Sequence, residues 1–166
     1  MSIEPILHSF SYSLGYLRDQ VADVSDDQMA LQPEGVPNHP SWTIGHLVFI
    51  AQAIGEVAGI EPLLEGEWVR LFGPGSTPSG EAGAYPSKKR LLTALDEAEE
   101  RLRNAIRRLG NLELDMPFPD PSYSDVFPTV RHAFTQVLVG HTGFHVGQIA
   151  VWRRAMGLAP LSRSFE

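Results

Sequence analysis

Apolar residues recur at helical spacing in four separate stretches of the chain. In the first stretch, which ends near residue 23, the apolar positions are Ile3, Ile6, Leu7, Phe10, Leu14, Leu17 and Val21. The second stretch, from Trp42 to about Ala58, is apolar on nearly all sides, which predicts a largely buried helix. The third and fourth run from Lys88 to Leu109 and from Thr129 to about Met156. Because apolar positions three or four residues apart indicate α-helix, the sequence predicts an all-α protein.

Two long connections separate these helices, residues 60–86 and 111–128, and both are rich in proline. Loops of this length inside a compact domain are usually crossovers or lids over a site. Ser41 and Ser87 are candidate N-caps of the second and third helices, because a serine side chain can accept a hydrogen bond from a free backbone N–H at a helix start. The pattern predicts a four-helix bundle with long crossover loops, forming a single domain over residues 1–166.

Two histidines of the last helix, His141 and His145, lie four residues apart and therefore on one face. A third histidine, His46, lies near the start of the apolar second helix. An H-x3-H pair alone is weak evidence, because most helical histidines are surface or hydrogen-bonded core residues. Here the pair lies in an apolar run with no carboxylate nearby, and imidazoles buried there without partners would be costly. We therefore predict that His46, His141 and His145 bind one divalent metal ion inside the bundle.

The predicted site has an open coordination position. Position 142 is threonine, so the general base of an H-E-x-x-H metalloprotease is absent. Three neutral imidazoles leave at least one position of a tetrahedral ion free, as in catalytic rather than structural sites. An ion in such a site lowers the pKa of a bound water or thiol. The sequence therefore favours an enzyme that activates one of these two nucleophiles.

Several other residues lie near the predicted ligands in the sequence. Gln148 lies one turn beyond His145 and could orient a ligand or bond a carbonyl on a neighbouring helix. Trp42, one turn before His46, is expected to pack in the core. The remaining histidines, in settings that do not suggest a ligand, are His8, His39 and His132. Glycines at 45, 140, 143 and 147 flank the predicted ligands and suggest either close helix packing or room for a ligand.

Composition narrows the class of protein. The formal net charge of −7 argues against a nucleic-acid partner. The chain has no cysteine, which excludes disulfides and suits a reducing compartment. The N-terminus lacks the basic and apolar segments of a signal peptide, and no apolar run is long enough to span a membrane. We expect a soluble, cytoplasmic protein that acts on a small molecule.

The segment Gly140 to Ile149 has the pattern H-x3-H-x-G-Q, and the following Arg153 to Gly157 has the pattern R-x3-G. With these motifs the last helix resembles that of the DinB-like (DinB/YfiT) superfamily. Trp42 to Leu47 is similar to the second-helix motif of the family, and Trp68 to Gly75 is similar to its W-x-x-L-F-G-x-G loop. Residues 115–129 also resemble the segment before the last helix of the family. The resemblance thus spans nearly the whole chain.

This resemblance implies a four-helix bundle with up-down-down-up order and a three-histidine metal site, here His46, His141 and His145. It also implies nickel or zinc as the metal, a homodimer, and thiol S-transferase activity with a low-molecular-weight thiol or a related thiol-dependent reaction. One departure is Val146, where many relatives have arginine, and this weakens the transfer of a particular substrate.

Three functions stay open from the sequence. The first is a metal-dependent transferase or hydrolase. The second is a non-catalytic metal-binding stress-response module, and the third is a structural helical protein with buried histidines.

Overall fold

The computed structural model describes residues 2–63 and 66–161. Within these ranges the regular structure is helical, apart from an isolated β-bridge between Pro117 and Thr129, so the all-α prediction is confirmed. The long helices are α1 (Glu4–Val21), α2 (Pro40–Gly55), α4 (Lys88–Arg108) and α7 (Thr142–Ala155), and α7 continues α6 (Val130–Thr135) through the π-helical turn η5 (Gln136–His141). The short elements are α3 (Gly66–Phe72), α5 (Asn111–Leu114) and the 3-10 turns Asp26–Gln28, Glu56–Ala58, Ala82–Ala84 and Pro121–Tyr123.

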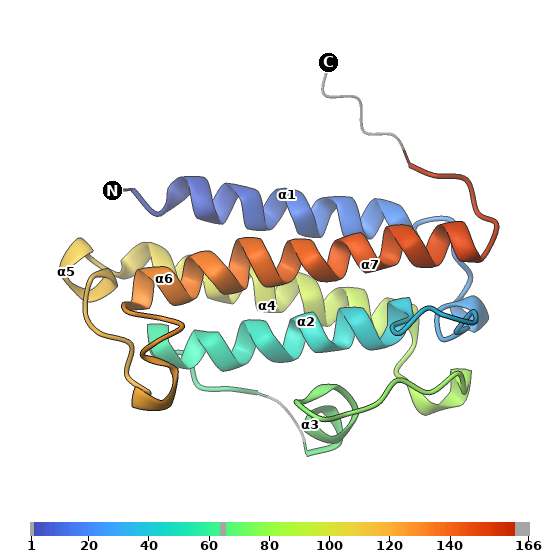
Figure 1. Cartoon of the computed structure of the whole chain (residues 1–166), viewed down its shortest axis with the longest axis horizontal. Helices are drawn as coiled ribbons and strands as arrows, with labels where there is room; N and C mark the ends of the chain where they lie inside the picture. The colour runs from blue at the N-terminus through green and yellow to red at the C-terminus, as the bar shows by residue number, and fades with distance from the viewer. Residues whose placement is uncertain (1, 64–65, 162–166) are drawn as a thin grey trace.

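The long helices lie side by side (Figure 1). In this view α1 and the α6–α7 helix run from left to right, whereas α2 and α4 run from right to left. The main helix pairs in contact are α2 with α4 and α1 with α7, and α2 also contacts α7. The short helix α3 lies outside this group, against α2. The contact between α2 and α7 brings two segments about a hundred residues apart in sequence to the same place.

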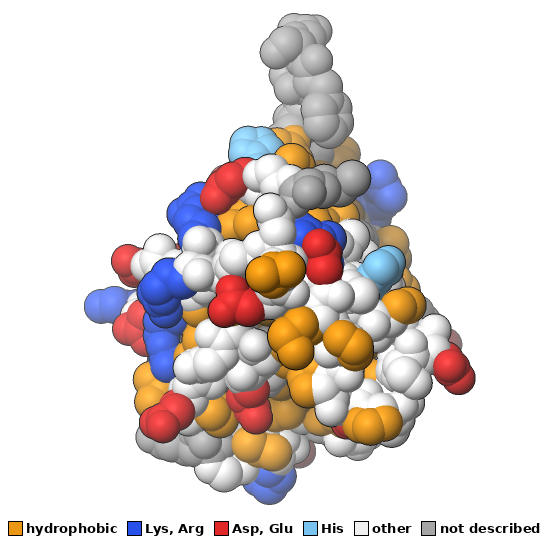
Figure 2. All heavy atoms as spheres, turned by 90° about the vertical axis from the view of Figure 1, so that its left-hand side faces the viewer, with side chains coloured by type: hydrophobic (Ala, Val, Ile, Leu, Met, Phe, Trp, Pro, Cys, Tyr) orange, Lys and Arg blue, Asp and Glu red, His pale blue; other side chains and the backbone are white. Residues whose placement is uncertain are grey.

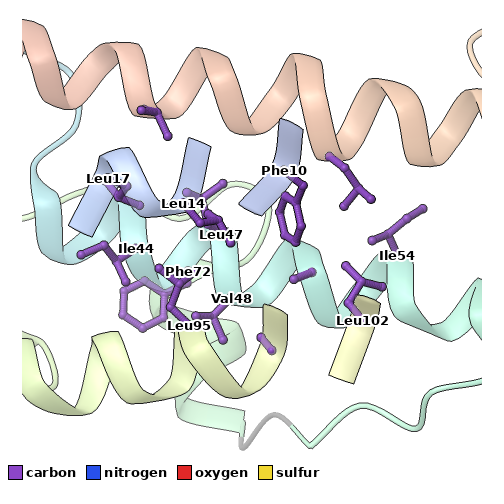
Figure 3. Close-up of a cluster of buried hydrophobic side chains, with 14 of the residues drawn as sticks. Phe10, Leu14, Leu17, Ile44, Leu47, Val48, Ile54, Phe72, Leu95 and Leu102 are labelled. Carbon is purple, nitrogen blue, oxygen red and sulfur yellow. The ribbon is translucent and has the colours of Figure 1, made fainter. Parts of the chain in front are cut away.

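One hydrophobic core joins these helices (Figure 3). The labelled side chains come from α1 (Phe10, Leu14, Leu17), α2 (Ile44, Leu47, Val48, Ile54), α3 (Phe72) and α4 (Leu95, Leu102). Each of them is at most 8% exposed. Burial of a side chain of this size stabilises the fold by roughly 1.5–3 kcal/mol relative to exposure. The core therefore fixes α2, which carries His46, against its neighbours.

The start of α2 differs from the prediction. We expected Ser41 to cap this helix, but the N-cap is His39, whose Nδ1 accepts a hydrogen bond from the backbone N–H of Trp42 (3.3 Å). Pro40 occupies the first turn, where its fixed φ suits the helix and its missing N–H is not needed. The predicted cap of α4 is confirmed, since Ser87 Oγ accepts from the N–H of Arg90 (3.3 Å).

The end of α7 is anchored by Arg153, which is only 2% exposed. Its guanidinium donates two hydrogen bonds to Asp23 (2.6 and 3.0 Å) and others to the carbonyls of Gln20 and Ala159. Gly157 then adopts a positive φ of 71°, a left-handed conformation that glycine tolerates at a helix end. These bonds tie α7 to the last turn of α1.

The end of the molecule nearest α5 is shown in Figure 2, where charged and apolar side chains are mixed. The segment between α4 and α6 contributes exposed apolar side chains, namely Leu112, Met116, Tyr123 and Val126. In Figure 1 this segment lies at the opposite end of the helices from the start of α2. None of the helices in the described ranges combines the length and the apolar character required to cross a bilayer.

Candidate metal centre

The structure brings His46, His141 and His145 together. The Nε2 atom of His141 lies 3.3 Å from Nε2 of His46 and 3.2 Å from Nε2 of His145. Within the described residues, these side chains form the one group of at least three possible metal-binding residues whose ligand atoms all lie within 4.8 Å of one another. His46 and His145 are 8% and 5% exposed, and His141 is partly exposed. The three residues predicted from the sequence thus present converging ring nitrogens.

The two elements that carry these histidines explain the geometry. His46 lies in the second turn of α2, on the side that meets α7. His141 is the last residue of the π-helical turn η5, and His145 lies in the first turn of α7. Single π-helical turns within α-helices occur frequently at functional sites. Here the side-chain hydroxyl of Thr142 donates to the carbonyl of Val137, five residues earlier (3.1 Å), so it satisfies an acceptor in this wider turn.

The outer ring nitrogens of two of the histidines have hydrogen-bond acceptors. Nδ1 of His46 lies 2.8 Å from the carbonyl oxygen of Phe72, and Nδ1 of His145 lies 2.9 Å from Oε1 of Gln148. An oxygen acceptor requires a proton on Nδ1, which leaves Nε2 with a free lone pair. Nδ1 of His141 is buried, and among the described residues it has no hydrogen-bond partner. Thus two of the three imidazoles are held in the tautomer that binds a metal through Nε2.

The environment also keeps the three rings neutral. The pKa of His141 and of His145 is lowered to about 4, mainly by burial and also by the neighbouring histidines. Burial lowers the pKa of His46 as well, although its hydrogen bond to Phe72 opposes this effect. A metal ion binds the neutral imidazole. All three side chains are therefore in the ligand form at neutral pH.

The spacing of the nitrogens fits a tetrahedral ion. Two imidazole nitrogens bound to zinc at about 2.0–2.1 Å with a tetrahedral angle between them are about 3.3 Å apart. The two measured separations, 3.3 and 3.2 Å, agree with this value. Three imidazoles occupy three of the four positions around a tetrahedral ion, so the fourth position would be open. The residues present therefore fit a divalent metal ion.

Trp42 supports this centre from the side of α2. Its ring is stacked on that of His46, with ring centroids 4.6 Å apart and an interplanar angle of 9°. The indole N–H donates to Ser76 Oγ (3.0 Å), which lies in the connection after α3. Trp42 is 8% exposed, as expected for a core residue, and it also fixes the plane of one predicted ligand.

The glycines near the site have different surroundings. At Gly45 a Cβ atom would collide with the Phe72 ring, whereas at Gly143 and Gly147 it would meet no neighbouring atom within 4 Å. At Gly140 the nearest atoms belong to the side chain of Gln136 in the same helix. The prediction of close helix packing therefore holds for Gly45, and Gly143 and Gly147 lie on an exposed face.

The sequence suggested that Gln148 orients a ligand or bonds a carbonyl on a neighbouring helix, whereas in the structure its side chain contacts His145 and Asn38. Its Oε1 faces His145 Nδ1 and also accepts a hydrogen bond from Asn38 Nδ2 (2.8 Å). Asn38 and the carbonyl of Phe72 were not predicted, because a linker residue and a backbone atom have no sequence signal that marks them as partners of a histidine. The spacing of Gln148, three residues after His145, could have indicated a helical neighbour of that ring.

The other histidines lie outside the group, as predicted. His8 and His132 are exposed, and Nδ1 of His132 lies 2.8 Å from Oγ1 of Thr129. His39 is fully buried, and besides capping α2 its Nε2 lies 3.0 Å from the carbonyl oxygen of Ser79. It therefore joins the start of α2 to the loop after α3.

A separate cavity of about 440 Å³ opens between α2 and α4. Val48, Gln52 and Trp68 line one side, and charged residues of α4 such as Glu97 and Arg101 line the other. None of the three grouped histidines lines it. The cavity is thus distinct from the candidate metal centre.

Comparison with known proteins identifies the family. No curated protein matches the chain. The family model of the DinB superfamily matches residues 10–149, a range that includes all three grouped histidines. This match confirms the resemblance found in the sequence motifs, and an all-helical fold with a three-histidine group is compatible with it. The chain belongs to the DinB superfamily.

Proposed function

We propose that this protein binds one divalent metal ion, nickel or zinc, through Nε2 of His46, His141 and His145. The observation that carries the proposal is the convergence of three imidazoles, in which Nε2 of His141 lies 3.3 and 3.2 Å from Nε2 of His46 and of His145, separations that suit tetrahedral coordination. Imidazole ligands suit both metals. The chain itself supplies the ligands, keeps them neutral by burial, and holds two of them in the required tautomer.

We further propose that the centre serves a metal-dependent transferase of the thiol S-transferase type or a hydrolase. A bound divalent ion would supply Lewis-acid chemistry at its open position, lowering the pKa of a water or thiol. No carboxylate belongs to the group, and Thr142 stands where a metalloprotease has its glutamate general base. A thiol, with an ordinary pKa of about 8.5, needs less assistance to ionise than water. This comparison favours a low-molecular-weight thiol as the small-molecule substrate.

Metal analysis of the purified full chain tests the proposal. We expect about one nickel or zinc ion per chain, and loss of this metal in His145→Ala. The control is His132→Ala, which removes an exposed histidine of the same continuous helix and should leave the metal content unchanged. Absence of stoichiometric metal from the wild-type protein, or an unchanged content in His145→Ala, would refute metal binding. A screen of thiol-transfer and hydrolysis reactions with the loaded protein then tests catalysis.

A non-catalytic metal-binding module, with a role in stress response, is the second candidate. It is favoured by the position of the ligands, because His46 on α2 and His141 and His145 on the last helix would let an ion join two helices inside the protein. Both candidates predict that a chelator lowers the melting temperature. They differ in turnover: only the enzyme converts a thiol or hydrolase substrate.

We also propose, as finer features of the architecture, a four-helix bundle of up-down-down-up order and a homodimer. The bundle is supported by the helix directions in Figure 1. The homodimer is supported by an exposed apolar face on the last helix, which includes Val139, Phe144 and Val151 (37%, 62% and 52% exposed) beside Gly143 and Gly147. Light scattering with size-exclusion chromatography measures the oligomeric state, and Phe144→Asp is expected to yield a monomer.

Organisation as one domain over residues 1–166 and a cytoplasmic location stay predictions. The absence of cysteine and the net charge of −7 support a cytoplasmic protein without a nucleic-acid partner. Cell fractionation tests the location.

A further inference from the structure

Gln148 connects the candidate metal centre to the segment before α2. Its Oε1 accepts a hydrogen bond from Asn38 Nδ2 (2.8 Å) and lies 2.9 Å from Nδ1 of His145. Asn38 and Gln148 are both partly buried, and they are 110 residues apart in the chain. The amide of Gln148 is therefore shared between a metal-ligand candidate and a residue on another segment.

The orientation of this amide decides the tautomer of His145. With Oε1 toward the ring, Nδ1 must carry the proton and Nε2 is free to bind a metal. With the amide reversed, its N–H₂ group would donate to Nδ1, and the proton of the neutral ring would lie on Nε2, where it blocks coordination. Asn38 favours one of these orientations. Its side-chain N–H₂ group donates to Oε1 of Gln148, and it would face the N–H₂ group of Gln148, another donor, if the amide were reversed.

The three imidazoles are thus oriented in three different ways. Nδ1 of His46 faces the backbone carbonyl oxygen of Phe72 (2.8 Å), which can only accept a hydrogen bond. Nδ1 of His145 faces the side-chain amide of Gln148, which can present either its accepting oxygen or its donating N–H₂ group. Nδ1 of His141 has no partner among the described residues. His145 is consequently the ligand whose tautomer depends on a reversible side chain.

We infer that Gln148 is the positioning residue of the centre, and that Asn38 holds it with its oxygen toward His145, so that His145 presents Nε2 to the metal. This inference rests on the proposed metal function. Outer hydrogen-bond partners of metal-binding histidines typically change metal affinity by about 10–100-fold when removed, which sets the size of the expected effect.

Two near-isosteric substitutions that each add one negative charge give a sharp test. In Gln148→Glu, the carboxylate can only accept, so His145 keeps its proton on Nδ1. In Asn38→Asp, the new carboxylate attracts the N–H₂ group of Gln148, reverses the amide, and moves the His145 proton to Nε2. Simple electrostatics predicts that both variants bind a cation more tightly. The positioning role predicts opposite effects: unchanged or tighter binding in Gln148→Glu, and binding weaker by about 10-fold or more in Asn38→Asp.

Two measurements on the full chain separate these outcomes. Zn²⁺ affinity is obtained by competition with a chelating dye, and the tautomer of His145 in metal-free protein is obtained from long-range ¹H–¹⁵N correlation spectra. Gln148→Leu should weaken Zn²⁺ binding by about 10–100-fold, while the matched control Gln136→Leu, an exposed position on the same continuous helix, should not. Thermal unfolding of each variant confirms that it is folded.

The results distinguish this inference from the proposed function. If the wild-type protein does not bind Zn²⁺ or Ni²⁺, the metal function fails, while the tautomer spectra still test the role of Asn38 and Gln148. If the wild-type protein binds metal but Asn38→Asp keeps the His145 proton on Nδ1, or shifts affinity in the same direction as Gln148→Glu, the inference is overturned and the metal function stands.

Discussion

Gly45→Ala tests how closely α3 is packed against the helix that carries His46. A Cβ atom at this position would lie well inside 3.0 Å of three carbon atoms of the Phe72 ring, a distance that real Cβ contacts do not reach. Phe72 is fully buried, with its ring against those of Trp68 and Tyr85 at centroid distances of 4.9 and 5.9 Å. The ring must therefore move, and few directions are open to it.

Two effects of opposite sign contribute to the stability change. Alanine is a better helix former than glycine by about 1 kcal/mol. Against this, an ordinary carbon contact is about 3.5–4.0 Å, so the ring or the helix must shift by at least about 1 Å. Overpacking of a core costs about 1–3 kcal/mol, and an overlap of this size should cost close to 3 kcal/mol. We expect a net loss of about 1–2 kcal/mol in the free energy of unfolding.

The assay compares this variant with Gly143→Ala. Gly143 lies on the exposed side of α7, and no atom lies within 4 Å of its would-be Cβ, so only the propensity gain of about 1 kcal/mol applies. At roughly 2–4 °C per kcal/mol for a chain of this size, the melting temperature should fall for Gly45→Ala and rise for Gly143→Ala. Because the carbonyl of Phe72 holds Nδ1 of His46, Gly45→Ala should also weaken metal binding. Equal stabilisation of both variants would refute this packing argument.

Three further predictions concern pH, a buried cation and the metal. Burial lowers the pKa of His39 to about 4, so between pH 6.5 and 4 the unfolded chain binds more protons than the folded chain, and the free energy of unfolding should fall as the pH drops. His39→Asn can still cap α2 but does not titrate; relative to this variant, the loss measured by urea denaturation should approach about 3 kcal/mol, and parallel curves for the two proteins would refute the prediction. Arg153→Leu should destabilise the protein by about 2 kcal/mol or more, because the buried carbonyls that it serves lose their donor. Asp23→Asn should cost less, since the amide oxygen can still accept a hydrogen bond and Arg153 keeps its bonds to the carbonyls; equal losses in calorimetry would contradict this assignment. Adding Zn²⁺ or Ni²⁺ at 100 times its dissociation constant should raise the unfolding free energy by about 2.7 kcal/mol, an increase that His141→Ala should abolish.

Much of the fold was accessible from the sequence because it depends on local patterns. The stripe of apolar residues in α4, including Leu91, Leu95 and Leu102, gave that helix within one residue at each end. The predicted ligands were accessible for a similar reason: a spacing of four residues fixes the relative direction of His141 and His145 on a helix. The proximity of His46 required a contact between α2 and α7, which only the fold provides.

The start of α2 and the partners of the ligands could not be predicted in this way. The sequence Asn38-His39-Pro40-Ser41 offers three side chains able to cap a helix, and tertiary contacts decide among them. His39 caps the helix with Nδ1, and its Nε2 lies 3.0 Å from the carbonyl oxygen of Ser79. Likewise, the role of Asn38 depends on Gln148, a residue 110 positions away. Such choices belong to packing between segments, which a single sequence does not encode locally.

The last helix contains a π-helical turn, whereas the sequence predicted one uninterrupted helix from Thr129 to about Met156. Phe134 and Val146 are both buried, yet twelve residues of continuous α-helix would place them about 120° apart around the axis. The π-helical turn Gln136–His141 accommodates an extra residue, and one residue corresponds to about 100°, which accounts for most of that difference. The helix thereby keeps one face toward the core before and after the turn, and the second half of that face carries His145 toward His46. Without this turn, Val146 would lie about 120° from Phe134 around the axis and would leave the core face. The π-helical turn is therefore what lets α6 and α7 pack against one core as a single continuous helix.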